Sequence, residues 1–158
     1  LGLQLLIDAA RAGRKAVLFS LELTDREARG HLLTLENGSD RSGEPVDIVT
    51  SDNISADYII RHLSGSKPGT LAIVDYLQVL DQKRSNPALP DQMLALRAFA
   101  RASGVVLGFI SQIDRSFDPK GKGVPDMLDL RLPNPVHAAT FSKACFLHDG
   151  EFRLQEVA

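Results

Sequence analysis

The sequence has few of the residues that build disulfides or zinc sites, and it has no long apolar run. Its single cysteine, Cys145, cannot form an intrachain disulfide, which suits the reducing cytosol. The four histidines lack metal-ligand spacing, so we expect no zinc site. No stretch approaches the roughly 20 apolar residues of a membrane span, and residues 1–12 lack the charged start and cleavage site of a signal peptide. These absences predict a cytoplasmic protein with no membrane contact.

An excess of positive charge is also missing. The formal net charge is −2 and the pI is about 6.1, so any contact with nucleic acid must come from local patches. The 158 residues are 44% hydrophobic, which fits one globular domain. A chain of this length buries about two-thirds of its unfolded surface.

Three short apolar runs organise the sequence, and segments with helical spacing separate them. This alternation predicts an α/β fold with a mostly parallel sheet. The runs cover residues 15–20, 71–74 and 105–110. Polar side chains follow each run: Ser20 and Glu22, then Asp75, then Ser111 and Gln112. Because ligands of open α/β sheets bind beyond the carboxyl ends of the strands, we expect these groups to converge on one site.

Each of these polar groups also has a simpler interpretation. Asp75 could only cap the strand or the turn after it, and Glu22 could be a solvated surface carboxylate. For Ser20 and Ser111, small residues at strand ends are the preferred interpretation. The convergence of all three strand ends is the argument for a site.

The remaining elements are predicted from spacing and turn residues. Thr24 and Glu27 form a capping box at a helix start. Asp149-Gly150 predicts the turn of a closing β-hairpin. We further expect helices at residues 1–12, 24–35, 54–63 and 92–103, a strand at 46–49, polar loops at 36–44 and 81–90, and a mobile loop at 114–125.

Three motifs resemble those of a known family. Phe19-Ser-Leu-Glu22, Val74-Asp-Tyr-Leu-Gln78 and Ile110-Ser-Gln-Ile-Asp-Arg-Ser116 are similar, in order and spacing, to motifs of the RecA-like ATPase domain of DnaB-type replicative DNA helicases. The resemblance extends from Leu1 to about Leu147. It implies a RecA-like three-layer fold, with a mostly parallel central sheet, helices on both faces and a C-terminal β-hairpin.

The resemblance also implies a function: an ATP-dependent helicase core that works as a homohexameric ring and translocates on single-stranded DNA in replication. ATP and Mg²⁺ would be the cofactors. Asp75 would hold Mg²⁺ through its water shell, and Ser20 would support the nucleotide site. Glu22 would activate the attacking water, and Gln112 would sense the γ-phosphate.

DNA contacts are assigned to four cations. Asp129-Leu-Arg131 resembles the family's next motif, although residues 132–136 depart from its continuation. Arg131 and Arg115 are therefore candidates for contact with a DNA phosphate or with the nucleotide of a neighbouring subunit. Lys83 and Arg84, in the proline-containing loop, are candidates for contact with the DNA backbone. A solvated surface cation is the competing interpretation for each.

The phosphate-binding motif G-x-x-x-x-G-K-[ST] does not occur in this sequence. We expect it upstream of Leu1, and we expect residues 1–158 to be a fragment of the core that also lacks the last strands and is inactive alone. Two alternatives stay open. One is a KaiC- or RadA-like ATPase that does not unwind DNA, and the other is a degenerate binding domain.

Overall fold

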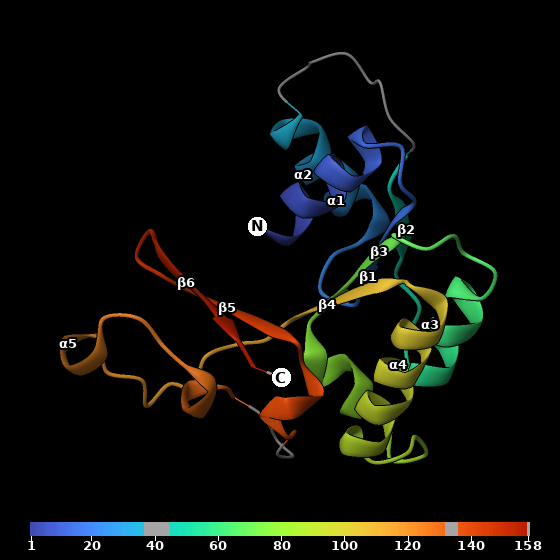
Figure 1. The fold of residues 1–158 in the computed structure, drawn as a ribbon. Helices are drawn as coiled ribbons and strands as arrows, with labels where there is room; N and C mark the ends of the chain where they lie inside the picture. The colour runs from blue at the N-terminus through green and yellow to red at the C-terminus, as the bar shows by residue number, and fades with distance from the viewer. Residues whose placement is uncertain (37–44, 132–135, 158) are drawn as a thin grey trace.

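A four-stranded parallel sheet forms the centre of the protein (Figure 1). The computed structural model describes residues 1–36, 45–131 and 136–157. The sheet order is β2-β1-β3-β4, and every neighbouring pair is parallel. Its strands are β1 (Ala16–Ser20), β2 (Asp47–Val49), β3 (Leu71–Asp75) and β4 (Val106–Ile110). The parallel sheet predicted from the three apolar runs is confirmed.

Helices cover both faces of this sheet (Figure 1). Alternate residues of β1 and β3 divide into two cores because successive side chains of a strand point to opposite faces. Val17, Phe19, Ala72 and Val74 belong to the core shared with α3 (Ala56–Leu63) and α4 (Leu89–Ser103). Ala16, Leu18, Leu71 and Ile73 belong to the core shared with α1 (Gly2–Arg11) and α2 (Asp25–Leu35). The predicted three layers are confirmed.

Local signals explain where the helices begin. The capping box of Thr24 and Glu27 is present at the start of α2, as predicted. Helix α3 begins at Ala56, two residues later than predicted, because the Ser55 side chain accepts a hydrogen bond from the Tyr58 amide. Helix α4 begins at Leu89, three residues earlier than predicted, since proline is tolerated in a first helical turn.

Gln92 is a buried amide that joins three segments, and nothing in the sequence pattern pointed to it. Its Oε1 accepts from the amide of Ala56 at 3.0 Å. Its Nε2 donates to the carbonyl oxygens of Leu80 at 2.7 Å and Pro87 at 2.8 Å. The side chain thereby fixes the start of α3 and the short helix η1 (Leu77–Asp81) against α4.

A C-terminal arm, residues 111–131 and 136–157, extends from the sheet (Figure 1). It ends in the predicted hairpin, in which Asp149 and Gly150 have φ of 46° and 80°. Both left-handed residues match the type I′ turn that favours Asp-Gly. The arm contains α5 (Pro119–Lys122), η2 (Met127–Asp129), η3 (Ala138–Thr140), β5 (Lys143–His148) and β6 (Glu151–Glu156).

The segment predicted as a mobile loop, residues 114–125, includes α5 and contacts the hairpin. Arg153 donates to the carbonyl oxygen of Pro125 at 2.7 Å. The rings of Phe117 and His148 pack edge to face at 5.2 Å. Of the other predicted loops, residues 37–44 lie outside the described part, as do 132–135 of the divergent segment. Within the described ranges, no helix has the length and apolar character to cross a membrane.

Candidate functional site

The ends of β1, β3 and β4 lie side by side at one edge of the sheet. In the strand register, Ser20 pairs with Asp75, and Asp75 pairs with Ile110. The three predicted motifs therefore leave the sheet at neighbouring positions. This edge is the carboxyl edge, where open parallel sheets bind their ligands.

Ser20 shapes the chain that carries Glu22. Its side chain is fully buried, and its Oγ accepts from the amides of Glu22 at 3.2 Å and Leu23 at 3.3 Å. Such a contact stabilises a tight turn directly after a strand. Ser20 thereby fixes the backbone from which the exposed Glu22 side chain projects.

Asp75 lies half-buried beside Glu22. Burial, and secondarily the Glu22 carboxylate, raises the pKa of Asp75 because both disfavour its ionised form. The peptide bond that follows, Asp75–Tyr76, is cis. The two carboxylates thus form a negative site at the centre of the carboxyl edge.

These carboxylates fit a magnesium ion better than a transition metal. In the described part of the chain, no group of three or more His, Cys, Asp or Glu side chains could hold a metal. Mg²⁺ keeps most of its water ligands and needs only one or two carboxylates. Burial is the larger cause of the raised pKa of Asp75, and a cation here would offset the smaller one, the repulsion from the Glu22 carboxylate.

Gln112 and Arg131 are joined in one hydrogen-bonded unit. The amide of Arg131 donates to the Gln112 carbonyl oxygen at 2.9 Å, and the amide of Asp114 donates to the Asp129 carbonyl oxygen at 2.7 Å. Ile113 and Leu130 form the antiparallel bridge between them. The Arg131 guanidinium also donates to Gln112 Oε1 at 3.4 Å. The predicted sensor and a predicted DNA contact therefore lie in one short ladder.

Gln78 connects this ladder to β3. Its Nε2 donates to the Arg131 carbonyl oxygen and, at 3.4 Å, to Ser111 Oγ. Its Oε1 is buried and has no hydrogen-bond partner within residues 1–36, 45–131 and 136–157. The sequence contained the signal, because Gln78 closes the second motif, but no role was assigned to it.

The four predicted DNA-contacting cations lie in two separate groups. Lys83 hydrogen-bonds Asn53, which follows the edge strand β2, and Arg84 is its exposed neighbour. Arg131 and Arg115 follow the other edge strand, β4.

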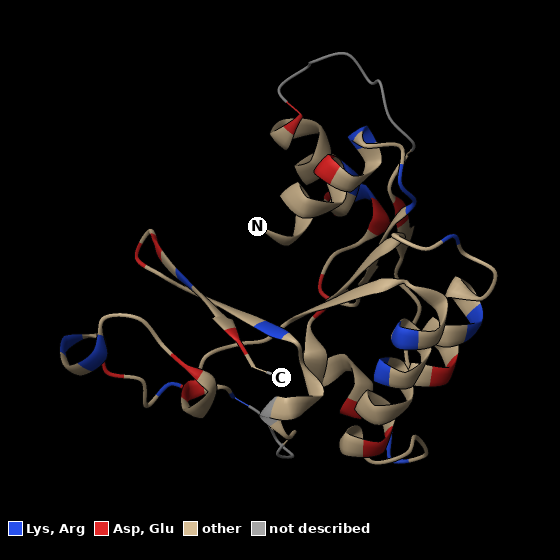
Figure 2. Ribbon diagram, in the orientation of Figure 1, with Lys and Arg blue, Asp and Glu red and all other residues tan. Residues whose placement is uncertain are grey.

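The arm carries further positive charge at Lys120 and Lys122 in α5 (Figure 2). Lys122 pairs with Asp126 at 2.6 Å and Asp129 at 2.9 Å. The amino group of Lys122 therefore fastens α5 to η2, whereas Lys120 is exposed.

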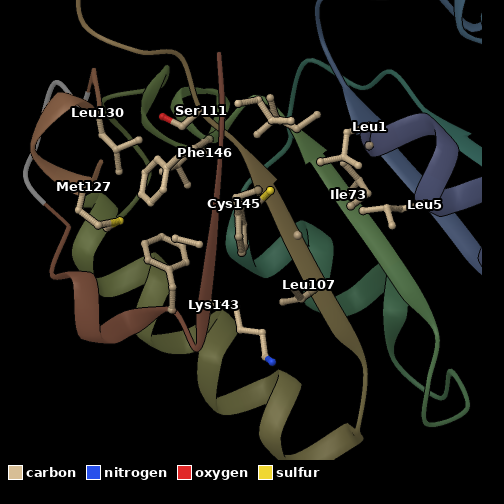
Figure 3. Close-up of a pocket in the computed structure, with 18 of the residues that line it drawn as sticks. Leu1, Leu5, Ile73, Leu107, Ser111, Met127, Leu130, Lys143, Cys145 and Phe146 are labelled. Atoms are coloured by element: carbon tan, nitrogen blue, oxygen red, sulfur yellow. The ribbon is translucent and has the colours of Figure 1, made fainter. Parts of the chain in front are cut away.

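A cavity of about 480 Å³ lies between the start of α1, β4 and β5 (Figure 3). Most of its lining is apolar, including Leu1, Leu107 and Phe146. Neither Glu22 nor Asp75 lines it. This cavity does not suit a polyanionic ligand, so we place the candidate site at the carboxyl edge.

Solved structures identify this arrangement of strands and helices. A DnaB-like replicative helicase, described with its interactions with primase, matches with a TM-score of 0.62 and 20% identity over 82% of this chain. A second structure, described as an ATPase domain, matches with a TM-score of 0.58 and 19% identity over the same share. The fold is RecA-like. The chain spans 39% of the first structure's chain and 57% of the second's.

The structural match to DnaB-like ATPase domains confirms, at the level of the fold, the resemblance predicted from the three motifs. No protein-family model matches the chain, and no curated protein matches it significantly. At about 20% identity, the similarity to these structures supports the RecA-like fold and does not establish the function. Function has to be argued from the residues at the edge.

Proposed function

We propose that this RecA-like core belongs to an ATP-dependent DNA helicase of the DnaB type, which couples ATP hydrolysis to translocation on single-stranded DNA in replication. One observation carries the proposal: the strand register brings Glu22, Asp75 and the segment of Gln112 to one edge. Phosphoryl transfer depends mainly on positioning and charge neutralisation, which such an edge can supply.

Each residue has a defined role in this proposal. Asp75 holds the water shell of Mg²⁺, which neutralises charge on the phosphates, and Ser20 maintains the turn behind Glu22. Glu22 accepts the proton of the attacking water. Gln112 donates a hydrogen bond from its amide to the γ-phosphate.

The nucleotide and DNA need contacts that these side chains do not provide. The sequence contains no glycine-rich phosphate loop, so we propose that the loop's N–H groups and lysine come from residues preceding Leu1 in the full chain. Arg131 and Arg115, in the C-terminal arm, and Lys83 and Arg84, after η1, contact DNA phosphates. A homohexameric ring would place both groups around a single strand of DNA.

The test is ATP turnover by the full chain with Glu22→Gln. Loss of the general base should reduce kcat by about 10²–10⁴-fold while ATP binding is retained. Glu151→Gln, at the exposed hairpin turn, is the matched control and should keep wild-type turnover. Unchanged turnover in Glu22→Gln, or no ATPase activity in the wild type, would refute the proposal.

A second candidate is a KaiC- or RadA-like ATPase that does not unwind DNA. One observation favours it: residues 132–136 depart from the helicase motif. Strand displacement on a forked duplex separates the two candidates. ATP hydrolysis without displacement would support this second function.

A further inference from the structure

Gln78 lies on a rigid part of the molecule. It belongs to η1, whose Leu77, Val79 and Leu80 side chains are buried in the core. The Leu80 carbonyl oxygen is also held by the buried Gln92 amide. The backbone that carries Gln78 is therefore fixed to the same core as β3, whose last residue, Asp75, lies three positions before it.

The Gln78 amide has only one favourable orientation. Its Nε2 donates to two acceptors, the Arg131 carbonyl oxygen and Ser111 Oγ. A flipped amide would direct Oε1 at the Arg131 carbonyl oxygen, and two acceptors would face each other. Among the residues that the structure describes, the observed orientation leaves the buried Oε1 without a partner. Burying an unpaired oxygen costs free energy, and an apolar side chain of the same size would avoid that cost. Packing alone therefore does not explain a glutamine at this position.

Arg131, whose carbonyl oxygen accepts a hydrogen bond from Gln78, donates two hydrogen bonds to Gln112. Gln78 fixes the Arg131 carbonyl oxygen, while the Arg131 amide and guanidinium donate to the backbone and side-chain oxygens of Gln112. Ser111 Oγ, the second acceptor of Gln78, is also 3.5 Å from the Gln112 carbonyl oxygen. Displacement of Gln112 therefore strains the contacts of Arg131.

We propose that Gln78 is a positioning residue that anchors the Gln112–Arg131 ladder to β3, so that nucleotide contact at Gln112 changes the affinity of Arg131 for nucleic-acid phosphate. The anchoring follows from the contacts, and the transmission to phosphate rests on the proposed function. Gln78 itself touches neither ligand.

Hydrogen exchange of the full chain tests the anchoring without any ligand. In Gln78→Leu, the Arg131 and Asp114 amides should exchange about tenfold faster, the factor expected for one lost hydrogen bond. The amides of Leu71 and Val106, which donate to the carbonyl oxygens of Lys15 and Thr70 just before β1 and β3, should be unchanged. Gln82→Leu, an exposed glutamine next to η1, is the matched control. Unchanged exchange at Arg131, or faster exchange throughout the sheet, would overturn the anchoring.

Gln78→Glu gives an independent result if the leucine variant does not fold. An ionised carboxylate only accepts hydrogen bonds, so it repels the Arg131 carbonyl oxygen, whereas a protonated carboxyl donates to it. Protection of the Arg131 amide, measured relative to wild type at each pH, should return as the pH falls through the pKa of that carboxyl. Protection that stays constant with pH would contradict the role of the Gln78 donor.

The transmission step is tested with a labelled oligodeoxythymidine, with and without a nonhydrolysable ATP analogue. In the wild type the analogue should change oligonucleotide affinity by about fivefold or more, and Gln78→Leu should reduce this factor toward one. The midpoint of thermal unfolding should stay close to that of Gln82→Leu. If the analogue changed the oligonucleotide affinity of Gln78→Leu by as much as it changes that of the wild type, the transmission would be overturned. No effect in the wild type would count against the proposed function, while the exchange result would still decide the anchoring.

Discussion

The sheet and the C-terminal arm position their parts of the candidate site by different means. The side chains of β1 and β3 are buried up to Asp75, and two hydrophobic cores enclose them. In the arm, Phe146 is only 3% exposed, but Leu147, Phe152 and Leu154 are 52%, 71% and 61% exposed. The hairpin has little core of its own, and contacts such as Arg153 to Pro125 tie it to residues 114–125.

This difference divides the site into two halves. Glu22 follows β1 and Asp75 ends β3, and burial fixes the positions of both strands. Gln112 and Arg131 lie in a ladder that depends on a few hydrogen bonds, including those from Gln78. Elements held by few apolar contacts open at lower free energy than the core. The half that would bind Mg²⁺ is therefore the rigid one, and the half that would respond to nucleotide is the adjustable one.

The largest expected effect is on the sheet side. Phe19 is fully buried on β1, and Phe19→Ala should lower the free energy of unfolding by about 3–5 kcal/mol, the usual cost of an emptied aromatic site. Phe152→Ala, the matched change on the exposed hairpin, should cost less than about 0.5 kcal/mol. Denaturant unfolding measures both. Equal losses would mean that the arm is as strongly packed as the sheet.

A smaller and more local effect is expected in the arm. Arg153→Ala removes the hydrogen bond to Pro125 and the contact of the guanidinium with the Phe146 ring, 5.8 Å away. We expect a loss of about 1 kcal/mol, seen as faster proteolysis of residues 114–125. The control is Gln155→Ala, an exposed neighbour on β6. A drop in global stability as large as that of Phe19→Ala would contradict the separation into two halves.

The sheet half was predictable from the sequence because its signals are local. The apolar runs before Ser20, Asp75 and Ser111 indicate buried parallel strands, and Thr24 with Glu27 marks the helix after Glu22. Their order along the chain was enough to place them at one edge. On this basis the sequence predicted Glu22 and Asp75 at this edge, and their roles in catalysis and metal binding stay predictions.

The ladder in the arm was less predictable because its contacts join residues far apart in the sequence. Gln78 and Arg131 are separated by 53 positions, and no periodicity links them. Gln92 was missed for the same reason, since its partner Ala56 is 36 residues away. Such amides look like surface residues in a sequence, and only the fold shows that they are buried or bonded.

The smallest expected effect concerns the charge of Asp75, at the end of β3. The raised pKa of Asp75 means that the folded state disfavours its carboxylate. The resulting stability is fully present below the unfolded-state pKa and is lost as the pH rises through the raised folded-state pKa. Asp75→Asn has no such loss, so it should gain stability relative to wild type across this acidic window and keep the gain at neutral pH.

The gain in Asp75→Asn should be smaller than the Arg153 effect because Asp75 is only half-buried and water screens its charge. Unfolding by denaturant at a series of pH values measures it, and Asp52→Asn, at an exposed loop position, controls for the loss of one negative charge. Glu22→Gln should reduce the difference, since the Glu22 carboxylate contributes to the raised pKa. A pH-independent difference between Asp75→Asn and wild type would show that burial and Glu22 do not act on this carboxylate, and the negative site at the carboxyl edge would then lose its electrostatic basis.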